Sequence, residues 1–176
     1  LHLLYMSFIY IQLLRIAKEK KVEFKYGWIG FPGQEKDYLN NPRSPFSFSI
    51  LNEKTVFRFF RLVDFNDADI GDIAKPVKTR NDRMHARGDI HCADIKSFEG
   101  ELCEYIRQMK SVISRQQPFL ADIYKGLIST YDEDYEFTQD DLESNFQDQY
   151  LLSEYELLFL AGNRQDKVSK FIREVY

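Results

Sequence analysis

Residues 93–116, with the sequence ADIKSFEGELCEYIRQMKSVISRQ, form the stretch that decides the fold. Apolar side chains recur along it mostly three or four residues apart, at Ile95, Phe98, Leu102, Tyr105, Ile106, Met109 and Ile113. Because an α-helix has about 3.6 residues per turn, this spacing gathers them on one side of the chain. The pattern predicts a long amphipathic helix, and Pro118 begins the next element.

Helical patterns continue on both sides of this stretch. The segments concerned are residues 3–21, 52–63, 68–88, 119–131, 155–161 and 165–175. Asn52 is expected to be an N-cap, and capping boxes are expected at Thr138–Asp141 and Ser153–Glu156. Only Phe46–Ile50 alternates as a strand would, and Pro76 is expected to restart or kink its helix. We therefore predict an all-α fold, a helical bundle.

The length of 176 residues suits one domain. We expect a bundle over residues 1–131 that contains an irregular, glycine- and proline-rich loop at about 26–51. An acidic run at 132–136 is most simply a solvated loop. It leads to residues 132–176, which we expect to form a C-terminal helical extension packed on the same domain.

Charge and cysteine content restrict the function classes. The net charge of −4 argues against a general polyanion binder, so any nucleic-acid contact has to be local. Cys92 and Cys103 form no CxxC motif or disulfide framework, which favours a reducing, cytoplasmic setting. We expect both to be small core residues.

The first residues, 1–17, are strongly apolar but are interrupted by His2, Gln12 and Arg15. The run is shorter than the ~20 residues that span a bilayer, so we expect no membrane segment. Apolar residues surround most of its circumference, which predicts a buried helix or one that forms an oligomer.

The segment most informative about function is KPVKTRNDRMHARG, residues 75–88. Its basic residues stand out in an otherwise acidic chain; they are Lys75, Lys78, Arg80, Arg83 and Arg87. On a helix, Asn81 and His85 share a face, whereas Arg80 and His85 lie about 140° apart. A histidine can move the proton of a ribose 2′-OH, a guanidinium can stabilise phosphate charge, and an asparagine can orient either group.

These residues resemble the HEPN family, whose motif is an arginine, a polar residue, three variable positions and a histidine. Arg80-Asn81-Asp82-Arg83-Met84-His85 matches it, within a similar region of about residues 52–116. HEPN domains are all-α, commonly dimeric, and many are metal-independent endoribonucleases of toxin–antitoxin, phage-defence and RNA-processing systems. The resemblance implies that residues 1–131 form the HEPN-like bundle.

The resemblance also implies roles for particular residues. Arg80 would bind the phosphate and the transition state, Asn81 would orient, and His85 would be the general acid/base. The products would carry a 2′,3′-cyclic phosphate and a 5′-hydroxyl. Lys75, Lys78, Arg83 and Arg87 would bind RNA in a homodimer that needs no cofactor or metal, with an antitoxin or a larger parent protein as a further partner.

Three other interpretations stay open. A non-catalytic HEPN-like dimerisation or protein-interaction module would use an exposed apolar surface instead of a catalytic cleft. A metal site could combine His85 and His91 with nearby Asp82, Asp89, Asp94 and Cys92, although no HExxH or CxxC spacing supports it. Arg80 and His85 could also lie on a solvent-exposed face and at the end of a helix without a catalytic role. The sequence contains no GxSxG and no phosphate-binding GxxxxGK[ST].

Overall fold

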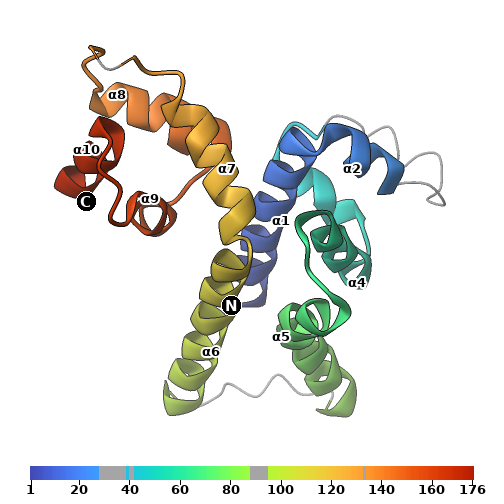
Figure 1. Ribbon diagram of the computed structural model, residues 1–176. Helices are drawn as coiled ribbons and strands as arrows, with labels where there is room; N and C mark the ends of the chain where they lie inside the picture. The colour runs from blue at the N-terminus through green and yellow to red at the C-terminus, as the bar shows by residue number, and fades with distance from the viewer. Residues whose placement is uncertain (28–38, 40–41, 88–94, 133) are drawn as a thin grey trace. The chain divides into compact units, whose positions relative to one another are not determined.

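The computed structural model describes residues 1–27, 39, 42–87, 95–132 and 134–176. Within these ranges every regular element is helical and no residue belongs to a strand, which confirms the predicted all-α fold (Figure 1). The chain forms two compact units, unit 1 from Leu1 to Arg115 and unit 2 from Gln116 to Tyr176. The division expected near residue 131, with an extension packed on the bundle, stays a prediction.

Unit 1 is built around its first helix. Its elements are α1 (His2–Glu19), α2 (Lys21–Gly27), the 3₁₀ helix η1 (Pro45–Ile50), α4 (Glu53–Val56), the 3₁₀ helix η2 (Phe57–Val63), α5 (Asp67–Arg87) and α6 (Ile95–Arg115). Helix α1 contacts α2, η1, η2, α5 and α6, and Figure 1 shows it in the middle of them. The helix with apolar residues on nearly all sides is therefore the central helix of unit 1.

Burial explains the composition of α1. Tyr5, Ile9 and Leu13 are fully buried, and each apolar side chain of this kind stabilises the fold by roughly 1.5–3 kcal/mol when it leaves water. Gln12 and Arg15, which interrupt the apolar run, are also buried, and Arg15 Nη1 donates to Gln12 Oε1 at 2.9 Å. The prediction of a buried helix is confirmed. Among the described residues, no helix is long and apolar enough to cross a membrane.

The end of α1 differs from the prediction of one helix over residues 3–21. Lys20 leaves helical geometry, with φ −106° and ψ 46°, and α2 starts at the next residue. The turn brings Phe24 of α2 to the rings of Phe48 and Phe59, with centroids 5.9 and 4.9 Å away. We attribute the break to these tertiary contacts, which a local helical pattern does not encode.

Local capping signals set the boundaries of the next elements. Asn52 Oδ1 accepts the Lys54 backbone N–H at 2.9 Å, which confirms the predicted N-cap. The chain then tightens into η2, which ends at Asp64 with a left-handed φ of 66°. Residues 46–50 are not a strand, because Pro45 opens a 3₁₀ helix there and Ser44 N donates to Ser47 Oγ at 3.4 Å.

Unit 2 follows with α7 (Gln117–Ile128), α8 (Gln139–Asp141), the π-helical turn η3 (Leu142–Asp148), α9 (Glu154–Ala161) and α10 (Lys167–Val175). Both predicted capping boxes are present: Thr138 N donates to Asp141 Oδ2 and Ser153 N donates to Glu156 Oε2, each at 2.9 Å. Gly162, with a φ of 40°, ends α9 in a backbone region that favours glycine. These local patterns define the ends of the helices of unit 2.

The core of unit 2 forms around Tyr124 of α7, which is fully buried against Phe146. Ser169 Oγ donates to Asp166 Oδ2 at 2.8 Å, so its single proton is used there. The 2.7 Å hydrogen bond between Tyr124 and Ser169 must therefore be donated by the Tyr124 hydroxyl. Arg164 lies over the Tyr124 ring, 5.4 Å from its centroid. This group holds α7 and α10 together.

Candidate functional site

Helix α5 carries the candidate motif, and it begins at a reciprocal cap. Asn66 N donates to Asp69 Oδ2 at 3.1 Å, and Asp69 N donates to Asn66 Oδ1 at 3.0 Å. These two bonds satisfy backbone donors that the first turn of a helix otherwise leaves without partners. The start of α5 is therefore fixed by two side chains that lie before the basic segment.

The helix continues through Pro76 without ending, so the expected restart does not occur there, and a kink at this position stays a prediction. Proline lacks the N–H that would bond the carbonyl four residues earlier, so tertiary packing has to compensate. Ile73 and Val77 bury their side chains, and the Tyr5 hydroxyl donates to the Ile73 carbonyl at 2.6 Å. Contacts with α1 thus hold the middle of α5 in place, and Lys75 and Lys78 of this helix are exposed.

Arg80 and Asn81 are brought into direct contact. Arg80 Nη1 donates to Asn81 Oδ1 at 2.7 Å, and both residues are half-buried. Because the guanidinium is a planar fork of donors, one fixed hydrogen bond restricts the direction in which its other N–H groups point. Asn81 therefore orients Arg80 within the helix.

His85 lies in the same continuous helix, which extends to Arg87. Four residues of α-helix separate it from Asn81, so the two Cα atoms are about one turn apart and about 40° apart around the axis. The side chains of residues 82–87 lie outside the described part of the chain, and these include Arg83, His85 and Arg87. The backbone of α5 brings the Arg80–Asn81 pair and the His85 position onto neighbouring turns.

The two predicted lysines differ in their surroundings. Lys75 Nζ forms an ion pair with Asp72 Oδ1 at 2.7 Å, and its side chain is 67% exposed. An exposed pair of this kind contributes little to stability, so a phosphate could displace the carboxylate at small cost. Lys78 is exposed, and no carboxylate of the described residues pairs with it.

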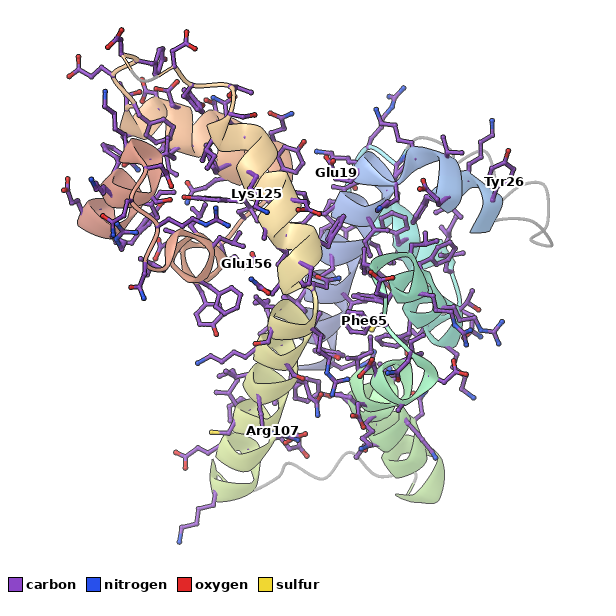
Figure 2. The ribbon with its side chains drawn as sticks, in the orientation of Figure 1. Glu19, Tyr26, Phe65, Arg107, Lys125 and Glu156 are labelled. Atoms are coloured by element: carbon purple, nitrogen blue, oxygen red, sulfur yellow. The ribbon has the colours of Figure 1, made fainter. Side chains whose placement is uncertain are left out.

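Helix α6 adds a charged network that the sequence analysis missed. Arg107, labelled in Figure 2, donates from Nε and Nη2 to the two carboxylate oxygens of Glu104, at 2.9 and 2.7 Å. Gln108 donates to the same carboxylate at 2.9 Å. The hydrogen bonds from Arg107 and then from Gln108 lower the pKa of Glu104, and the positive charge of Lys75 on α5 lowers it further. Charges on α5 and α6 therefore act on one another.

A second contact ties the end of α6 to the first half of α5. Arg115 lies 2.7 Å from Asp69 and 3.2 Å from Asp72. Hydrogen bonds from Lys75 and then from Arg115 lower the pKa of Asp72. In the sequence this bridge is visible only as three charged residues, Asp69, Asp72 and Arg115. Their spacing along the chain does not show that α5 and α6 meet there.

The residues of the metal and cysteine interpretations lie partly outside the described part of the chain. No group of three or more His, Cys, Asp or Glu residues that could hold an ion occurs among the described residues. His91, Cys92 and the surrounding carboxylates of the metal alternative lie outside them, so that alternative has no structural description. Cys103 is a free thiol and is exposed on α6, so the prediction that it is a core residue is wrong. The apolar stripe of α6 that the pattern predicted passes beside it.

That apolar stripe is covered at one end only. Val112 and Ile113 are buried, whereas Phe98 and Ile106 are 50% and 41% exposed. Exposed apolar side chains mark an interaction surface when they form a contiguous patch, whereas isolated ones are ordinary on globular proteins. Phe98 precedes the charged network in the chain and Ile106 lies between Glu104 and Arg107, and all of them belong to the same unit as α5.

Comparison with known proteins found no matching protein family, no matching curated protein and no matching solved structure.

Proposed function

We propose that the chain is a metal-independent endoribonuclease of the HEPN type. The observation that carries the proposal is the contact between Arg80 and Asn81, at 2.7 Å, on a continuous helix that also contains His85. An asparagine that holds a guanidinium one turn before a histidine brings together a phosphate-binding group, an orienting group and a proton-transfer group. The all-α fold is compatible with the proposal.

In the proposed reaction, His85 takes the proton of a ribose 2′-OH. The 2′-oxygen attacks the adjacent phosphorus, and the bond from phosphorus to the 5′-oxygen breaks. An imidazolium returns a proton to the leaving oxygen, which leaves a 2′,3′-cyclic phosphate and a 5′-hydroxyl. Arg80 stabilises the negative charge that develops on the phosphoryl oxygens, and Asn81 keeps its donors directed there.

Basic residues around the motif supply the RNA contacts in this proposal. Lys78 is exposed and Lys75 exchanges its surface carboxylate for a phosphate; Arg83 and Arg87 follow on the same helix. Phosphate contacts of this kind add affinity that decreases as salt concentration increases. RNA, a second copy of the chain, and an antitoxin or a larger parent protein are the proposed partners, in a cytoplasmic toxin–antitoxin or phage-defence system.

The second candidate is a non-catalytic HEPN-like dimerisation or protein-interaction module. The observation that favours it is the exposure of Phe98 and Ile106 on α6, 50% and 41%. An interaction module needs such an apolar face but requires no proton-transfer residue. It predicts that substitution of Phe98 abolishes association, while substitution of His85 has no effect on any measured property.

Incubation of the purified chain with a structured RNA substrate in the presence of a chelator tests the proposal. The expected result is cleavage at an unchanged rate, with fragments that carry a 2′,3′-cyclic phosphate and a 5′-hydroxyl. If activity disappears with the chelator and returns with one particular ion, the histidine–arginine mechanism is wrong. If no RNA is cleaved under any condition, the interaction module becomes the better account.

A further inference from the structure

Unit 2 differs from unit 1 in its charge. Its residues include five lysines and arginines but thirteen aspartates and glutamates, whereas unit 1 has nineteen basic and fifteen acidic residues. The acidic character of the whole chain therefore comes from its last third. A surface of this charge repels nucleic acid and attracts cationic groups. The negative charge of unit 2 therefore favours a basic binding partner.

A hollow of about 730 Å³ opens within this acidic unit. It lies between the end of α7, the segment that follows α7, and the start of α10, and we call it the unit 2 hollow. Lys125, labelled on α7 in Figure 2, is one of its lining residues. The volume is within the range of about 300–1,000 Å³ that is usual for ligand sites. Its floor is apolar, since Phe137 and Val168 are buried there.

Two tyrosine rings form a wall of the hollow, and both are held in place at their hydroxyl ends. Tyr131 accepts a hydrogen bond from Asn145 Nδ2 at 2.7 Å, and Tyr135 donates one to Asp141 Oδ1 at 3.0 Å. The ring centroids are 5.2 Å apart. Rings that are fixed before binding lose little entropy when a ligand stacks on them. Aromatic faces of this kind attract cations, and the planar guanidinium stacks on them best.

Carboxylates complete the lining. Asp132 and Asp134 flank the tyrosines, are exposed, and form no ion pair with another described residue. Lys125 and Lys167 also line the hollow, but Lys125 lies 3.9 Å from Asp122, and Lys167 has its own interaction partner. Asp166 also lines the hollow, and its carboxylate accepts from the Ser169 N–H and hydroxyl. Asp132 and Asp134 are the carboxylates that lie beside the two rings.

We propose that the unit 2 hollow is a docking site for an arginine-containing segment of a partner protein. The guanidinium of one arginine stacks on the free side of the ring of Tyr135, which is 46% exposed, and Asp132 and Asp134 pair with it. An apolar neighbour of that arginine packs on Phe137. This function is separate from RNA cleavage, because none of these residues belongs to α5 or to its basic segment.

The experiment measures binding of a fluorescein-labelled peptide, acetyl-Arg-Leu-Arg-Leu-Arg-amide, to the full chain by fluorescence anisotropy. The matched probe replaces every arginine with citrulline, which has nearly the same shape and no charge. The arginine peptide is expected to bind at least about tenfold more tightly, since a cation over an aromatic ring and beside carboxylates contributes on the order of one to two kcal/mol. Equal binding of the two peptides overturns the proposal.

Two variants and a control assign the binding to the hollow. One variant combines Asp132→Asn with Asp134→Asn, and the other is Tyr135→Leu. Each should lower the affinity for the arginine peptide by about five- to tenfold. The control, Asp140→Asn with Asp148→Asn, removes the same charge elsewhere in unit 2 and should leave the affinity within about twofold. If the control variant lowers the affinity as much as the hollow variants do, the peptide is attracted only by the overall charge of unit 2 and the hollow is not a binding site. If a single-stranded RNA oligonucleotide competes for the hollow, the partner class is wrong.

Discussion

The Arg80 guanidinium donates a hydrogen bond to the Asn81 amide oxygen at 2.7 Å, and both side chains are half-buried on α5. Neighbouring residues of a helix point about 100° apart, so this contact requires the long arginine side chain to fold back toward the asparagine. The pair forms a fixed donor group one helical turn before His85.

Asn81→Ala should lower the rate of RNA cleavage by roughly tenfold, less than the loss expected for Arg80 or His85, because an orienting residue moves no proton. The measurement is single-turnover cleavage at saturating RNA. Asn81→Asp is the matched variant: it keeps the acceptor for Arg80 and should retain most of the activity. An Asn81→Ala variant that cleaves at the wild-type rate would show that the contact has no role in the reaction.

Lys78→Ala should weaken RNA binding and reduce the slope of log affinity against log salt by about 1, because one phosphate contact is lost. The cleavage rate at saturating RNA should stay unchanged. Lys54→Ala removes an exposed lysine of α4, outside the basic segment, and is the control for charge alone. Equal effects of the two substitutions would mean that RNA is attracted by general charge and that α5 has no dedicated surface.

The chain should form a homodimer at tens of micromolar, with the exposed part of α6 in the interface. Phe98→Ser should shift the mass measured by light scattering toward that of the monomer, since an apolar side chain that is 50% exposed would be covered by the second copy. Cys103→Ser changes an exposed residue of the same helix without removing a large apolar side chain, and it should leave the mass unchanged. A monomeric wild-type chain contradicts the prediction. Most apolar side chains of α1 are buried within unit 1, whereas Leu3 and Leu4 near its start are 80% and 57% exposed.

Tyr124→Phe should destabilise the protein by about 1 kcal/mol, the usual net contribution of a buried hydrogen bond. It should also change the response to alkali. Burial raises the pKa of Tyr124 to about 12, above the value of about 10 expected in an unfolded chain. A raised tyrosine pKa supplies stability that is complete below pH 10 and is lost as pH rises toward 12. Thermal unfolding of the variant should therefore depend less on pH in this window; an identical dependence would contradict this.

Capping residues made the helix boundaries of unit 2 predictable, because Thr138–Asp141 and Ser153–Glu156 act within four residues of sequence. The same applies to Asn52. The break at Lys20 and the 3₁₀ geometry of Phe57–Val63 were not predictable, because they depend on side chains that meet only after folding. The motif itself can be read from the sequence, but the Arg80–Asn81 contact cannot.

Interactions between helices were the other part that the sequence did not predict. The Glu104–Arg107–Gln108 network lies on one helix and could have been inferred from its spacing of three and four residues. The effect of Lys75 on Glu104 could not, because it depends on how α5 and α6 pack against one another. Burial of α1 was predicted by its composition, although composition did not say which helices would cover it.

The most direct measurement of the central claim is the single-turnover rate of RNA cleavage by His85→Ala, beside the wild-type chain and Arg80→Ala. The account predicts that His85→Ala lowers the rate by about 10²–10⁴-fold, the usual contribution of general acid/base catalysis. Arg80→Ala should lower it by about 10²–10³-fold through the lost transition-state contact. Both variants should unfold within a few degrees of the wild type. A folded His85→Ala variant that cleaves RNA at the wild-type rate would contradict the account.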